Sequence, residues 1–136
     1  MARTLWDISP ALAPDSPVFP GDTPFSLQWV ARIGPGCPVN VSAITLSPHV
    51  GAHADAPLHY DDAGAAIGEV ALEPFLGRCR VIHAIGCGPL VRAAHVAHAL
   101  DDRLPPRVLV RTFAQAPTAW TDDFAAYDPA LVTLLA

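Results

Sequence analysis

Apolar and polar positions alternate over short stretches of this chain, a pattern that predicts β-strands separated by turns. In one such stretch, Ile44 and Leu46 fall on one side of an extended chain, and Ala43 and Thr45 fall on the other. The strand candidates are residues 4–8, 25–33, 39–47, 80–85 and 107–112. Proline and glycine interrupt the segments between them. We therefore expect an α/β fold with a mixed sheet and few helices.

Two segments favour helices. Residues 91–100 have helical character, and this helix is expected to stop near Asp101. A second helix is expected to start at Asp128, because aspartate caps free backbone N–H groups and Pro129 suits the first helical turn. The apolar run that follows reaches Ala136 without a capping residue, which predicts that a C-terminal segment is missing. The alternative is a short terminal helix docked on the core.

Composition limits the class of protein. The 136 residues suit a single domain, and 51% hydrophobic against 15% charged residues excludes a disordered chain. The net charge is -5 and the eight basic residues are scattered arginines, so we expect no nucleic-acid partner. No apolar stretch approaches the roughly 20 residues that span a bilayer, and no secretory signal is recognisable. The three cysteines lack metal or redox spacing, so we expect reduced, mostly buried thiols in a cytoplasmic protein.

Chemistry-bearing side chains concentrate in one short segment. His49, His53, Asp55 and His59 lie within eleven residues and all have odd numbers, so in an extended chain they would share one face. The opposite face would be entirely apolar, with Val50, Ala52, Ala54, Ala56 and Leu58. A helix would separate the last two polar residues from the first two, and the prolines and glycine here oppose it. We therefore expect an extended segment with one polar face.

The residue types on that face are those of a catalytic metal site. Two imidazoles and a carboxylate are the usual protein ligands of catalytic zinc, which keeps a further position for water. A carboxylate can also bridge two metal ions. Manganese is the main competing metal, because oxygen ligands suit it. The alternative without metal is a group of ordinary surface histidines on an edge strand.

The same segment resembles the motif of the cyclase family of metal-dependent hydrolases. That motif reads H-x-G-T-H-x-D-x-P-x-H, and its matches here are His49, Gly51, His53, Asp55, Pro57 and His59. Ala52 replaces the common threonine. The side chain at this motif position does not bind metal, so the replacement leaves the predicted ligands unchanged. Similarity to one subgroup extends to residues 5–10, 17–24 and 105–112, so the resemblance covers nearly the whole chain.

The resemblance implies a role for each of five residues. His49, His53 and Asp55 would bind zinc, with Asp55 shared between two zinc ions per subunit, and His59 would accept and donate protons. Phe19 stands where the subgroup has an aromatic residue that contacts substrate. The implied reaction is hydrolysis of N-formyl-L-kynurenine to L-kynurenine and formate, in tryptophan breakdown. Family members are longer, and a later histidine and glutamate complete their two-metal site, so this chain is expected to lack those ligands.

The resemblance also implies a swivelling β/α/β type core and a homodimer or higher assembly. We expect the proline-rich arm, residues 6–24, to pack across the subunit interface. The remaining histidines are expected to be structural: His95 and His98 on a solvated helix face, and His83 in the core. The tryptophans expected in the core or an interface are Trp6, Trp29 and Trp120.

Two other functions stay open. One is a cyclase-family hydrolase with the same ligands but a different substrate, such as an isatin-type cyclic amide. The other is a truncated, non-catalytic module that only binds metal or assembles with a partner. Turnover of the two substrates separates the hydrolases, whereas metal content and oligomeric state identify the non-catalytic module.

Overall fold

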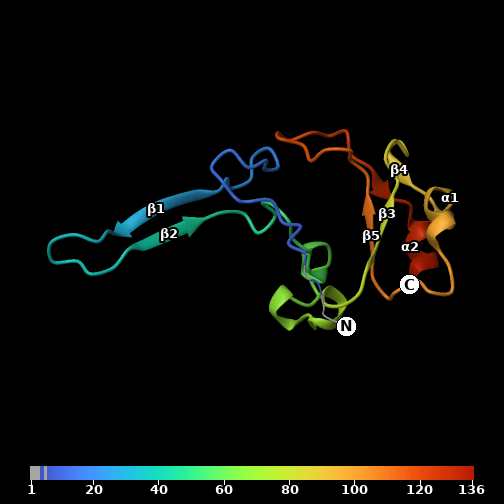
Figure 1. Ribbon diagram of the computed structural model, residues 1–136, viewed down its shortest axis with the longest axis horizontal. Coiled ribbons are helices and arrows are strands. Elements are labelled where there is room, and N and C mark those ends of the chain that lie inside the picture. The colour runs from blue at the N-terminus through green and yellow to red at the C-terminus, as the bar shows by residue number, and fades with distance from the viewer. Residues whose placement is uncertain (1–3, 5) are drawn as a thin grey trace. The chain divides into compact units, whose positions relative to one another are not determined.

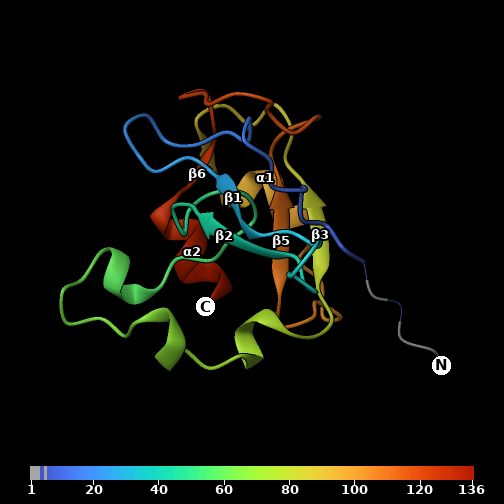
Figure 2. The same ribbon diagram turned by 90° about the vertical axis from the view of Figure 1, so that its left-hand side faces the viewer.

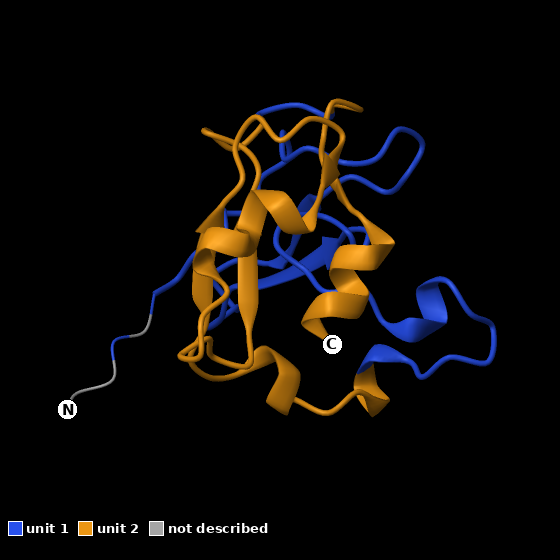
Figure 3. Cartoon of the chain, turned by 90° about the vertical axis from the view of Figure 1, so that its right-hand side faces the viewer, with its two compact units in different colours: residues 1–67, 118–120 blue, residues 68–117, 121–136 orange. Residues whose placement is uncertain are grey.

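Figure 3 shows the two compact units into which the chain of the computed structural model divides. Unit 1 comprises residues 1–67 and 118–120, and unit 2 comprises residues 68–117 and 121–136. The structure describes residue 4 and residues 6–136. This part of the chain contains two α-helices and three two-stranded sheets, joined by turns and short 3-10 helices. Both parallel and antiparallel pairs occur, which confirms the predicted α/β class.

The strands of unit 1 form an extended hairpin (Figure 1). Strand β1 (Ser26–Ala31) pairs antiparallel with β2 (Val41–Thr45), and the register shifts once, between Trp29 and Ala31. Both strands fall within predicted segments. The loop that joins them contains an antiparallel bridge between Gly34 and Cys37. The backbone N–H of each of these two residues donates to the carbonyl of the other at 3.0 Å.

Most residues of this hairpin are exposed. Every residue of β2 and all but the last residue of β1 are exposed, including the large apolar side chains of Trp29, Val30 and Ile44. A two-stranded hairpin alone is only marginally stable in water. Alternating apolar and polar residues predict one buried and one exposed face, but the residues on both faces of these strands are mostly exposed.

Unit 2 is built from two parallel strand pairs and two helices. Its strands are β3 (Arg80–His83), β4 (Leu90–Val91), β5 (Val108–Arg111) and β6 (Ala126–Tyr127). Strand β3 pairs with β5, and these two lie side by side in Figures 1 and 2, while β4 pairs with β6. The helices are α1 (Ala93–Val96), which continues into the 3-10 helix η4 (Ala97–Ala99), and α2 (Pro129–Leu135). The remaining 3-10 helices of the described chain are η1 (Pro57–His59), η2 (Ile67–Glu69) and η3 (Glu73–Phe75).

The buried core of unit 2 explains which strand predictions are confirmed. Its members are Ile82, Ala84, Val91, Val96 and Leu131, which come from β3, the residue after it, β4, α1 and α2. The predicted strands at residues 80–85 and 107–112 and the predicted helices are all present, although α1 and η4 divide the first helical segment into two short turns. Strands β4 and β6 span two residues each, too few for a recognisable alternation.

Several predictions of burial and structure are wrong. His83 is exposed because it alternates along β3 with the buried Ile82 and Ala84. The three cysteines are free thiols, as expected, but none is buried. Trp6, Trp29 and Trp120 are 81%, 49% and 39% exposed, so they are not in the core, and their place in an interface stays a prediction. The strand predicted at residues 4–8 is absent from its described residues, and Leu5 lies outside them.

None of the described helices is long and apolar enough to cross a bilayer.

Helix α2 provides a first prediction, because its start depends on one side chain. Asp128 caps the helix by accepting a hydrogen bond from the backbone N–H of Ala130 at 2.9 Å, and Leu131 in the same turn is fully buried. We expect Asp128→Ala to lower the free energy of unfolding by about 1 kcal/mol, the usual effect of losing a helix cap. Urea denaturation followed by circular dichroism measures this loss.

The matched control is Asp128→Asn, which keeps a capping oxygen but removes the charge that faces Arg92 Nε at 3.6 Å. We expect this variant to keep most of the stability, because exposed ion pairs contribute little. An equal loss in both variants would assign the effect to the ion pair and not to the cap.

Candidate metal centre

The segment that carries the predicted ligands is not extended. It turns after Ser47, where the Val50 N–H donates to the Ser47 carbonyl at 3.2 Å, and Gly51 then adopts the left-handed conformation with φ +77°. The expectation of one polar and one apolar face is therefore wrong. Of the five residues predicted to form the apolar face, only Val50 is buried, and Leu58 is 47% exposed. Gly51 and Pro57 bend the chain, so alternate residues no longer point to opposite sides as they do in an extended strand.

The 3-10 helix η1 directs His59 back towards the start of the segment. Pro57 occupies its first turn, the N–H of His59 donates to the Ala56 carbonyl at 2.9 Å, and the N–H of Tyr60 donates to the Pro57 carbonyl at 3.1 Å. As a result the rings of His49 and His59 lie close together, with their centroids 4.4 Å apart. The turn and the short helix, and not an extended chain, thus bring these side chains together.

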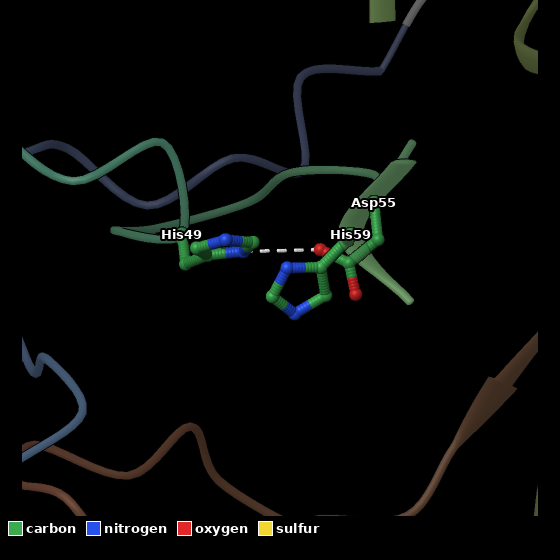
Figure 4. A group of neighbouring side chains, drawn as sticks. All are labelled: His49, Asp55 and His59. Carbon is green, nitrogen blue, oxygen red and sulfur yellow. Dashed lines mark ion pairs between the residues drawn. The ribbon is translucent and has the colours of Figure 1, made fainter. Parts of the chain in front are cut away.

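All four predicted side chains meet in unit 1. Nδ1 of His49 lies 3.0 Å from Oδ1 of Asp55, and Nε2 of His53 lies 3.5 Å from the same oxygen. One ligand atom each from His49, Asp55 and His59 lie within 4.8 Å of one another (Figure 4). The side chains of His49, His53 and Asp55 are about one third exposed, at 32%, 33% and 36%. The cluster is therefore partly exposed to solvent.

The orientation of His53 suits a metal ligand. Its Nδ1 lies 2.9 Å from the carbonyl oxygen of Gly51. Because a carbonyl only accepts, Nδ1 donates in this contact, and Nε2 is the ring nitrogen that lies towards Asp55. Histidines that bind metal generally donate their second ring N–H to a backbone carbonyl or a carboxylate, which holds the ring in place.

The donor atoms fit a zinc ion. Two ligands of one tetrahedral zinc lie about 3.3 Å apart, given bond lengths of about 2.0–2.1 Å. The separations of 3.0 and 3.5 Å from Asp55 to the two histidines bracket that value. The group of three mutually close ligand atoms is formed by His49, Asp55 and His59, whereas the predicted ligand His53 contacts Asp55 but is not part of that group. Neutral imidazole and carboxylate are a donor set for zinc or manganese.

Ser47, at the end of a predicted strand, also contacts the segment and is itself bound by Asp22. Ser47, which is 4% exposed, donates its hydroxyl proton to Oδ2 of Asp22 and accepts the backbone N–H of His49 at 3.2 Å. The Ser47 hydrogen bond, followed by one from the backbone of Thr23, holds the pKa of Asp22 below its usual value. No spacing rule connects positions 22 and 47, so these contacts required the structure.

Phe19 and the other candidate residues lie in different surroundings. The Phe19 ring is 58% exposed and meets the ring of Trp120 edge to face, with centroids 5.0 Å apart, inside unit 1. Nδ1 of His95 accepts the backbone N–H of Arg92 at 3.0 Å and so helps to cap α1. Across the described residues, neither His95 nor His98 belongs to a group of three metal-ligating side chains.

Gly51 provides a second prediction. We expect Gly51→Ala to destabilise the protein by about 1–2 kcal/mol, because a left-handed backbone strains an L-residue. The added Cβ would also lie 2.5 Å from a methyl group of Leu12, which must move. Since the Gly51 carbonyl holds His53, zinc affinity should fall about tenfold. Thermal denaturation and zinc titration measure the two effects.

Gly86→Ala is the matched control, since Gly86 has φ +79° but no atom within 4 Å of the added Cβ. It should cost similar stability and leave zinc affinity unchanged. A fall in zinc affinity in both variants would trace the effect to general destabilisation.

Comparisons with known proteins identify the family of the chain. The family model described as "Putative cyclase" matches residues 6–133. The kynurenine formamidase of Delftia acidovorans is 70% identical over 136 residues, which are all of this chain and 65% of that protein. The kynurenine formamidase of Bordetella pertussis is 65% identical over 135 residues, 98% of this chain and 64% of that protein. The chain thus spans slightly less than two thirds of these relatives. Because the family match includes nearly every residue, the chain belongs to the cyclase family.

Proposed function

We propose that the complete protein is an arylformamidase that hydrolyses N-formyl-L-kynurenine to L-kynurenine and formate, in tryptophan breakdown. The observation that carries this proposal is the cluster of His49, His53, Asp55 and His59 in a chain 70% identical to a kynurenine formamidase. We further propose that it acts in the cytoplasm as a homodimer, with zinc as its metal.

In this proposal His49, His53 and Asp55 hold the first zinc ion. Oδ1 of Asp55 faces both histidines. Asp55 would be shared with a second zinc ion, which would need further ligands beyond those of this segment. Bound zinc supplies a Lewis acid that lowers the pKa of water from about 16 to about 7 and stabilises negative charge on a carbonyl oxygen.

His59 is proposed to move the proton. Hydrolysis adds water to the formyl carbon and breaks the bond to the aniline nitrogen, which must leave with an added proton. The ring of His59 lies against that of His49, and the residue is exposed. An imidazole there can take a proton from the attacking water and give it to the leaving nitrogen.

Phe19 is proposed to contact the aromatic ring of the substrate. Its exposed ring already packs edge to face on Trp120, the arrangement that aromatic rings prefer. The distinction between formylkynurenine and an isatin-type ring would then depend on this part of unit 1.

The deciding experiment compares the gene's complete product with the 136-residue chain. Each is assayed for release of L-kynurenine, with and without a chelator, and then with added zinc or manganese. Activity of the complete protein that is lost to chelator and restored by zinc would support the proposal. A complete protein that binds metal but leaves formylkynurenine intact, while it opens isatin, would assign a different substrate. A complete protein that binds no metal would overturn the proposed site.

A further inference from the structure

We propose that Asp22 and Ser47 are positioning residues that hold the backbone at His49, and through it the metal cluster. The proposal rests on the proposed metal-binding function of His49. It concerns residues outside the motif segment: one from the turn before β1 and one just after β2.

Hydrogen-bond chemistry fixes the direction of the contacts. A carboxylate accepts and never donates, so the single proton of the Ser47 hydroxyl must point at Oδ2 of Asp22. That leaves the oxygen's lone pairs for the backbone N–H of His49, which lies 3.2 Å away. The carboxylate thus sets the rotation of the hydroxyl, and the hydroxyl in turn fixes the peptide at His49.

Burial keeps this arrangement in one state. Ser47 is the one polar residue of the described chain that is fully buried, with 4% of its surface exposed. Its own N–H donates to the Thr23 carbonyl at 3.0 Å, and its carbonyl accepts from the Val50 N–H at 3.2 Å. A buried polar group with each partner in place is costly to rearrange, because each broken bond leaves an unsatisfied group.

The same contacts join the turn that carries Phe19 to the metal cluster. The N–H of Asp22 donates to the Phe19 carbonyl at 3.0 Å, which closes that turn. The carboxylate at the end of the turn reaches Ser47, two residues before His49. Metal ligands need a placement within about 0.5 Å, which requires support from outside the ligand segment. Asp22 and Ser47 supply this support.

The experiment measures zinc affinity in the complete protein, by competition with a chromophoric chelator and without substrate. We expect Asp22→Ala and Ser47→Ala each to weaken zinc binding about tenfold, as loss of a supporting contact usually does. Because both act through one contact, the double variant should also lose only about tenfold, and not a hundredfold. Ser42→Ala, at an exposed serine of β2, is the matched control and should bind zinc like the unmodified protein.

A second measurement needs no metal. Amide hydrogen exchange at His49, followed by NMR in metal-free protein, should become faster in both variants and remain unchanged in Ser42→Ala. Folded variants with unchanged zinc affinity and unchanged exchange at His49 would overturn the proposal, as would additive losses in the double variant. If Ser47→Ala does not fold, Asp22→Ala alone decides, since Asp22 is only partly buried. If the unmodified protein binds no zinc, the proposed function fails, and exchange at His49 still tests the positioning role.

Discussion

Asp55→Asn is expected to reduce formamidase activity of the complete protein by about a thousandfold or more and to abolish tight zinc binding. Asp55 faces both His49 and His53, with Oδ1 at 3.0 and 3.5 Å from their ring nitrogens. The substitution preserves size but removes the negative charge that makes this oxygen a good ligand. Metal-ion catalysis supplies several kcal/mol of transition-state stabilisation, and each 1.4 kcal/mol corresponds to about tenfold in rate.

Zinc content by atomic emission and kcat/KM measure the two effects. Asp62→Asn is the matched control, because Asp62 is exposed and lies only a few residues further along the chain. It should keep both metal and activity. An Asp55→Asn protein that retains stoichiometric zinc at the same affinity would remove Asp55 from the ligand set.

His59→Ala is expected to lower kcat by about 10²- to 10⁴-fold while zinc remains bound, because general acid–base catalysis typically contributes that much. The rings of His49 and His59 are 4.4 Å apart, so the side chain is close enough to serve the same reaction centre. Added imidazole should restore part of the activity, since a free base can replace a missing proton carrier. Stopped assays with and without imidazole give this result.

His53→Ala distinguishes proton transfer from metal binding. The cluster allows His59 as a third ligand, because its ring nitrogen lies within 4.8 Å of ligand atoms from both His49 and Asp55. If His53 is the ligand, His53→Ala loses zinc and His59→Ala keeps it. The reverse pattern, without rescue by imidazole, would exchange the roles of the two histidines. His98→Ala, at an exposed histidine of η4, controls for the loss of an imidazole elsewhere.

The sequence by itself was enough to identify the family and to predict a metal site. Two histidines, an aspartate and a third histidine at motif spacing indicate a metal site wherever the backbone brings them together, because ligand type depends on side-chain chemistry alone. Element types were also predictable where the signal is local. Asp128 and Pro129 specify the start of α2 through a cap and a fixed φ angle, and the turn at Gly34 separates the two strands of the hairpin.

Burial was less predictable, because alternation shows which side chains share a face but not which face is covered. His83 lies in an apolar run, yet it points away from the core on β3, and the hairpin β1–β2 exposes both of its apolar faces within this chain. The short strands β4 and β6 depend on pairing between distant segments. A strand of two residues is too short to show an alternation of apolar and polar positions, so the sequence does not reveal this pairing.

The path of the backbone through the site was decided by the tertiary structure alone. Alternation predicted one flat face, but a left-handed glycine and the 3-10 turn at Pro57 bring the four side chains together by bending. The support that Asp22 and Ser47 give to His49 likewise spans 25 residues between the two partners. Hydrogen bonds between distant segments depend on how loops meet in space, whereas the ligand chemistry depends only on which side chains are present.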